Sequence, residues 1–126
     1  MTLPTERYQN EIYALLRIVA GFLFFWHGLD KIFGVFGHGN PDEPELIRYT
    51  AGIIELICGP LIFLGLFTRV AAFISSGLMA GAYFIVVAPE SLLPYMVPPG
   101  DIVVLYCFVF LYLSAKGDGI WSLGNS

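Results

Sequence analysis

Charged residues are scarce in this sequence. Only 13% of its 126 residues are Asp, Glu, Lys or Arg, whereas 57% are hydrophobic. Soluble domains carry about 25% charged residues, so a soluble fold would have nowhere to hide this much apolar surface. With six Lys and Arg against ten Asp and Glu, the chain also lacks the basic patch of a nucleic-acid-binding protein. We therefore expect a membrane protein that lies in a lipid bilayer and binds no nucleic acid.

Several kinds of active site are also missing. Cys58 and Cys107 fall in apolar stretches without CxxC spacing, so neither a disulfide framework nor a redox pair is indicated. The histidines, His27 and His38, do not suit a bis-histidine haem because His38 falls in a connecting loop. No phosphate-binding glycine loop, nucleophile elbow or metal-ligand cluster appears. These absences make a self-contained enzyme hard to support, and we predict no metal site.

Four apolar stretches are close to the length needed to cross a membrane. They run approximately over residues 12–36, 48–67, 70–88 and 101–115. About 20 helical residues cross a hydrocarbon layer of about 30 Å, and the fourth stretch is short for this. We predict one transmembrane domain over residues 1–126, an all-α integral membrane four-helix antiparallel bundle. No signal-peptide pattern opens the sequence, so we expect the first span to be retained.

Positive charge is concentrated at one end of this predicted bundle. Only Lys31 and Arg48 fall on the side of the first and third connections. The other Lys and Arg residues, on the side of both termini, are Arg7, Arg17, Arg69 and Lys116. Because Lys and Arg are retained preferentially in the cytoplasm, we expect both termini to be cytoplasmic.

Four side chains fall at a similar depth in the predicted spans. His27 and Glu55 would each lie about 10 Å below the outer boundary, and Tyr83 and Tyr106 about 7–8 Å below it, at 1.5 Å per residue. An imidazole, a buried carboxylate and two phenols could bind a polar head group or move protons. They could equally be a His-Glu contact that holds two helices together and two tyrosines that anchor the interface. The sequence leaves both interpretations open.

The remaining charged groups of the spans are expected at the rims. Asp30 and Lys31 lie near the outer end of the first span, where they can extend to water or form ion pairs. We expect Arg17 to reach the inner head groups or to pair with Glu11, and Arg69 to lie on the same inner rim. Charge pairing or a rim position is therefore the prediction for Arg17, Asp30, Lys31 and Arg69.

Small residues on the third span predict close packing against a neighbour. Gly77 and Gly81 form a GxxxG pair, and Ala72, Ser76 and Ala80 form a second row. Both rows permit close approach of helices and are common in membrane proteins.

The chain resembles the DoxX family of small bacterial membrane proteins. The segments that carry the resemblance are WHGLDKIFG, GIIELICG, GLFTR, LYCFVFL and GxGxWSL, in this order along nearly the whole chain. The resemblance implies a four-helix protein of the bacterial inner membrane, with relatives linked to thiosulfate and quinone oxidoreduction. It draws attention to Arg17, His27, Lys31, Glu55 and Arg69. Val87 stands where many members have histidine. This difference weakens the hypothesis of a proton relay, which would need another imidazole at the outer end of the bundle.

Two functions remain open at this point. The first is a non-catalytic or co-catalytic oxidoreductase subunit: the pocket around His27 and Glu55 binds a quinone-like or other small ligand, and a redox partner subunit supplies the electron-transfer centre. The second is a structural or assembly subunit of a membrane complex without ligand chemistry, in which His27 and Glu55 clamp two helices together. Assembly into a homo-oligomer is compatible with either function.

Overall fold

The computed structural model describes residues 3–34, 44–94 and 100–124. Within these ranges every regular element is a helix and none is a strand. The elements, in chain order, are α1 (Pro4–Arg7), α2 (Gln9–Phe33), α3 (Glu45–Leu64), α4 (Thr68–Ala82), the π-helix η1 (Tyr83–Val87) and α5 (Gly100–Lys116). Helices α2 and α3 begin at Gln9 and Glu45, slightly before the predicted spans at 12 and 48.

Glycines in the left-handed conformation end the first two long helices. Gly34 follows α2 with φ 64° and Gly65 follows α3 with φ 72°, a backbone region that other residues rarely adopt. At the second site Leu66 N–H donates to the carbonyl of Leu61 at 2.8 Å, and Gly65 N–H donates to that of Ile62 at 3.1 Å. This pattern closes α3 and reverses the chain within three residues before α4 begins at Thr68.

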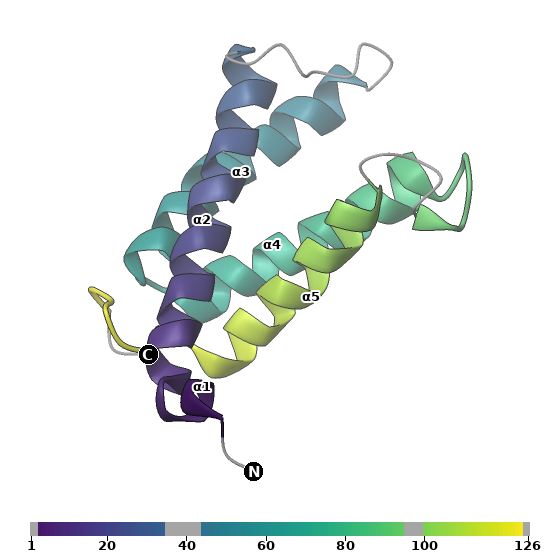
Figure 1. The fold of residues 1–126 in the computed structure, drawn as a ribbon. Coiled ribbons are helices and arrows are strands. Elements are labelled where there is room, and N and C mark those ends of the chain that lie inside the picture. The colour runs from purple at the N-terminus through teal and green to yellow at the C-terminus, as the bar shows by residue number, and fades with distance from the viewer. Residues whose placement is uncertain (1–2, 35–43, 95–99, 125–126) are drawn as a thin grey trace.

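The long helices form two antiparallel hairpins. Helix α2 packs along α3, and α4 packs along α5. Figure 1 shows that the two hairpins approach each other near the chain termini and diverge toward the opposite end. Phe24 of α2 joins them in the middle, where its ring lies 4.6 Å from that of Phe110 of α5. The hairpins therefore meet closer to the chain termini than the candidate polar residues lie.

The outer surface of the helices is apolar, as a lipid environment requires. Large side chains such as Leu15, Val19, Phe73 and Phe108 are exposed. Several polar and charged groups are buried instead, namely Arg17, Glu55, Thr68, Ser75, Ser76 and Asp118. Three helical segments in the described ranges, Gln9–Phe33, Glu45–Leu64 and Thr68–Val87, are long and apolar enough to cross a membrane. With the shorter α5 as the fourth helix, the predicted all-α membrane fold is confirmed.

Close packing between helices occurs at a different set of glycines from the predicted pair. A Cβ atom added to Gly21 of α2 would lie 2.5 Å from the backbone nitrogen of Phe63, and one added to Gly59 of α3 would lie 2.8 Å from that of Phe25. Gly77 and Gly81 have no atom within 4 Å of such a Cβ. The predicted approach at this GxxxG pair is therefore wrong for the described chain, because the pair lies away from the α4–α5 contact.

The second small-residue row of α4 does pack against a neighbour. Ala72 is fully buried, and the Ser76 hydroxyl donates to the carbonyl of Cys107 in α5 at 2.8 Å. A side-chain bond to a backbone carbonyl satisfies a polar group that would otherwise be costly in lipid. This row holds the second hairpin together.

Candidate functional site

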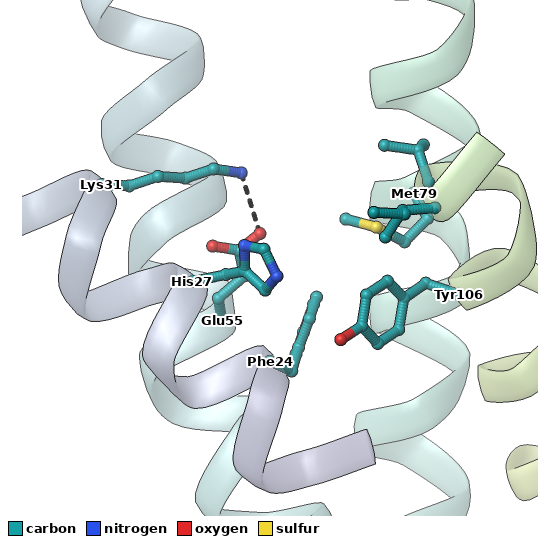
Figure 2. Close-up of a pocket in the computed structure, with 8 residues that line it drawn as sticks. Phe24, His27, Lys31, Glu55, Met79 and Tyr106 are labelled. Carbon is teal, nitrogen blue, oxygen red and sulfur yellow. Dashed lines mark hydrogen bonds and ion pairs between the residues drawn. The ribbon is translucent and has the colours of Figure 1, made fainter. Parts of the chain in front are cut away.

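A cavity lies between the two hairpins. Its volume is about 100 Å³, and all four long helices contribute to its wall. Figure 2 shows His27 and Glu55 on one side and Met79 and Tyr106 on the other. The lining residues are Phe24, His27 and Lys31 of α2, Glu55 of α3, Met79 of α4, and Ile102, Val103 and Tyr106 of α5. The site thus combines four polar side chains with four apolar ones.

An ion pair joins α2 to α3 at this cavity. Lys31 Nζ lies 2.9 Å from Glu55 Oε1, and the Glu55 side chain is only 2% exposed, compared with 26% for Lys31. A carboxylate buried to this degree in a membrane span is costly unless a charge partner stabilises it. Lys31 is therefore more than a rim residue: it contributes directly to the cavity and neutralises its acidic group.

His27 lies at the open side of the cavity. Its side chain is exposed although it lies on a membrane-spanning helix, and its ring centroid is 6.0 Å from that of Tyr106 in an edge-on arrangement. Tyr106 in turn stacks on Phe110 at 5.5 Å. These rings form a wall that links α2 to α5, and they place an imidazole and a phenol within reach of the same small space.

One of the predicted ligand-binding residues lies elsewhere. Tyr83 does not line the cavity: it begins η1, and its hydroxyl donates to the carbonyl of Leu92, in the chain that follows. Depth along the axis does not fix the direction in which a helical side chain points, and Met79, one turn earlier, occupies the α4 side of the wall. Asp30, which was expected at the rim and not in the cavity, lies half-buried near the end of α2.

Arg17 has a role that the sequence prediction missed. Instead of reaching the head groups or pairing with Glu11, its side chain is fully buried. Nε donates to the carbonyl of Ile62 at 3.0 Å, and the terminal nitrogens donate to carbonyls of the segment after α5. The acceptors in that segment are Asp118, Ile120 at 2.9 Å and Trp121 at 2.7 Å. The prediction was wrong because backbone acceptors leave no charge signal in the sequence.

Asp118 and Arg69 add further hydrogen bonds between the start of α4 and the end of α5, near the bonds of Arg17. The Asp118 carboxylate accepts from the backbone N–H of Thr68 at 3.1 Å, at the beginning of α4. Arg69 lies at the surface, as predicted, but its guanidinium donates to the last carbonyls of α5, at Ser114, Ala115 and Lys116. A cation at a helix C-terminus stabilises the partial negative charge there. Arg17 and Arg69 are therefore structural groups far from the cavity.

Reasoning from the sequence also missed the apolar part of the cavity and the network partner Asp118. Met79 and the pair Ile102 and Val103 resemble ordinary span residues, so nothing in their type identifies them as cavity-lining. Asp118 had a usable signal, because GDG directly after a span places a carboxylate near a helix end. No group of three His, Cys, Asp or Glu side chains that could hold a metal ion occurs among residues 3–34, 44–94 and 100–124.

Together, the fold and the cavity define an all-helical membrane protein with four polar side chains around a cavity between two helix hairpins. The DoxX family model matches residues 12–88, and the chain belongs to the DoxX family. A protein of Haemophilus influenzae, named "Uncharacterized protein", is 39% identical over 127 residues, which cover 95% of this chain and 93% of that protein. "Putative oxidoreductase CatD" of Bacillus subtilis is 39% identical over 72 residues, or 54% of each chain. No solved structure shows a significant match.

Proposed function

We propose that this DoxX-family protein is a subunit of, or accessory to, a membrane redox system, and that its cavity binds the head group of a quinone-like molecule. One relative carries an oxidoreductase name, which supports the redox part of the proposal. The observation that carries the ligand part is the meeting of His27, Lys31, Glu55 and Tyr106 around one cavity.

The chemistry of the cavity suits the polar edge of a ring-shaped head group. A cavity of about 150 Å³ accommodates benzene in a protein of known structure, so the present volume of about 100 Å³ would enclose only part of a quinone ring. Lys31, His27 and Tyr106 can donate hydrogen bonds to the carbonyl oxygens of a quinone, while Phe24 and Met79 contact its ring face. Quinone reduction takes two electrons and two protons, so a redox partner subunit would supply the electrons.

The structural alternative also has a specific observation in its favour. The Lys31–Glu55 pair joins α2 to α3, and such a contact stabilises a membrane bundle without any ligand. In that function the protein would be an assembly subunit of a membrane complex. The two proposals differ in what happens to ligand binding when the pair is altered.

The proposed location is the bacterial inner membrane, with both termini in the cytoplasm and one transmembrane domain over residues 1–126. Lys116 supports a common basic end, because its Nζ lies 5.2 Å from the ring centroid of Tyr13 near the start of α2. Arg69, at the start of α4 and bonded to the last carbonyls of α5, adds to the positive charge there. This excess favours the cytoplasmic side. A homo-oligomer is compatible with this arrangement.

A binding titration tests the function. The purified protein in lipid nanodiscs is titrated with a short-tailed ubiquinone, in parallel with His27→Ala and Glu55→Gln. We expect saturable binding to the wild type and about tenfold weaker binding to His27→Ala, which removes a hydrogen-bond donor to the quinone. Binding to Glu55→Gln should also weaken, because Lys31 loses the carboxylate that positions its ammonium group. Equal binding by all three proteins, or none, rejects the proposal. Loss of bundle stability or partner co-purification, without a change in ligand binding, supports the assembly function.

A further inference from the structure

The segment after α5 folds back on the membrane-spanning helices. Gly117 accepts a hydrogen bond from the hydroxyl of Tyr13 in α2. The backbone N–H groups of Leu123 and Gly124 donate to the carbonyls of Leu64 and Gly65, each at 2.9 Å. Residues 117–124 are thus attached to α2 and to the turn between α3 and α4, and Figure 1 shows the segment beside that turn.

Two large aromatic residues in this region have unusual backbone conformations. Phe67, in the turn before α4, has φ 52°, and Trp121 has φ 55°. They are the non-glycine residues with positive φ in the described part of the chain. Such a conformation costs about 1–3 kcal/mol and persists only where surrounding contacts impose it. Here Arg17 binds the Trp121 carbonyl, so a fully buried side chain fixes this strained position.

Both aromatic side chains nevertheless point away from the protein interior. Phe67 is 70% exposed and Trp121 is 59% exposed. Burial of the rings within this chain therefore does not explain the strain. We attribute the outward position of these two neighbouring aromatic rings to the environment around the protein.

The position of Phe67 and Trp121 relative to the membrane indicates which environment surrounds them. The turn at 65–67 connects two membrane spans, so it must lie at a membrane boundary. The Arg17 side chain bonds to Ile62, just before the turn, and to Trp121, so Trp121 lies near the same level. Tryptophan is enriched at this level because its amphipathic ring suits the head-group region. The exposed Arg69 at the start of α4 would complement anionic lipid head groups.

We propose that Phe67 and Trp121 form an interfacial anchor that inserts into the lipid head-group region, and that Arg17 is the internal clamp that positions it. The partner is the lipid surface itself, continuous with the apolar belt of the spans. The anchor is independent of the cavity and of the proposed redox function.

Tryptophan fluorescence tests the anchor. The chain contains two tryptophans, so Trp26→Phe leaves Trp121 as the single emitter. In proteoliposomes we expect blue-shifted emission, strong quenching by lipids brominated near the head group, weaker quenching by lipids brominated near the chain end, and little quenching by iodide in water. Emission typical of hydrated tryptophan, with iodide quenching and none by brominated lipids, overturns the proposal.

The clamp is tested in the same single-tryptophan background. Arg17→Gln removes donors to the segment, and Arg69→Gln removes contacts to the end of α5 only. We expect Trp121 to lose quenching by the shallow brominated lipids in the Arg17 variant and to retain it in the Arg69 variant. Unchanged quenching in a folded Arg17 variant rejects the clamp. Should that variant fail to fold, the measurement on Trp26→Phe alone still decides whether Trp121 lies in lipid.

Discussion

The carboxylate of Glu55 lies 2.9 Å from the ammonium group of Lys31, and this pair joins α2 to α3 at the wall of the cavity. Lys31 is one turn after His27 on α2, so both side chains lie on the same face of that helix. The pair accounts for a buried charge in a membrane span and leaves the imidazole at the open side of the cavity.

Substitution of Lys31 and substitution of Glu55 should lower the free energy of unfolding by unequal amounts. Lys31→Met leaves the buried Glu55 carboxylate without its ammonium partner and should lower the free energy of unfolding by about 2–3 kcal/mol. Glu55→Gln should cost less, because the partly exposed Lys31 can extend toward water. Reversible unfolding in SDS gives both values, and the double variant gives the coupling. Additive effects of the two substitutions would show that the contact contributes no interaction free energy.

The glycine contact between α2 and α3 should tolerate no side chain. Gly21→Ala would place a methyl group 2.5 Å from the backbone nitrogen of Phe63, so the helices must separate. We expect a loss of about 1–3 kcal/mol in unfolding free energy. Gly77→Ala is the matched control, because its added Cβ meets nothing within 4 Å. Equal destabilisation by both substitutions would contradict the packing described above.

Arg17 should be the least replaceable cation in the chain. Arg17→Lys keeps the charge but cannot reproduce the planar set of donors that reaches Ile62, Ile120 and Trp121. Several buried carbonyls would lose partners, and the expected cost is about 3 kcal/mol or more. The exposed Arg69→Lys should cost less than about 1 kcal/mol. Unfolding in SDS measures both, and a tolerated Arg17→Lys would show that charge alone suffices at this position.

Much of the fold follows directly from the sequence because lipid imposes simple rules. Apolar runs near 20 residues predict the helices, and short turns such as 65–67 make successive helices antiparallel. Axial position was also enough to indicate that His27, Glu55 and Tyr106 could share a level, and the structure places all three on one cavity. Axial position could not exclude Tyr83, because the direction of a side chain depends on helix rotation.

The other differences have equally specific causes. The sequence drew attention to GxxxG at Gly77, but the tight helix contact uses Gly21 and Gly28 on α2 against Gly52 and Gly59 on α3. Each of these pairs is spaced by seven residues, a heptad interval that keeps small residues on one face of a supercoiled pair. The role of Arg17 was hidden for another reason. Its acceptors are backbone carbonyls, which every residue type carries.

The most direct test of the cavity compares two tyrosines in a quinone titration of the nanodisc-embedded protein. Tyr106→Phe removes a hydroxyl from the cavity wall, whereas Tyr83→Phe removes one that bonds to Leu92 outside it. If the cavity binds a quinone head group, the dissociation constant rises about three- to tenfold for Tyr106→Phe, as loss of one hydrogen bond implies, and stays unchanged for Tyr83→Phe. Equal constants for the two variants would contradict binding at this cavity.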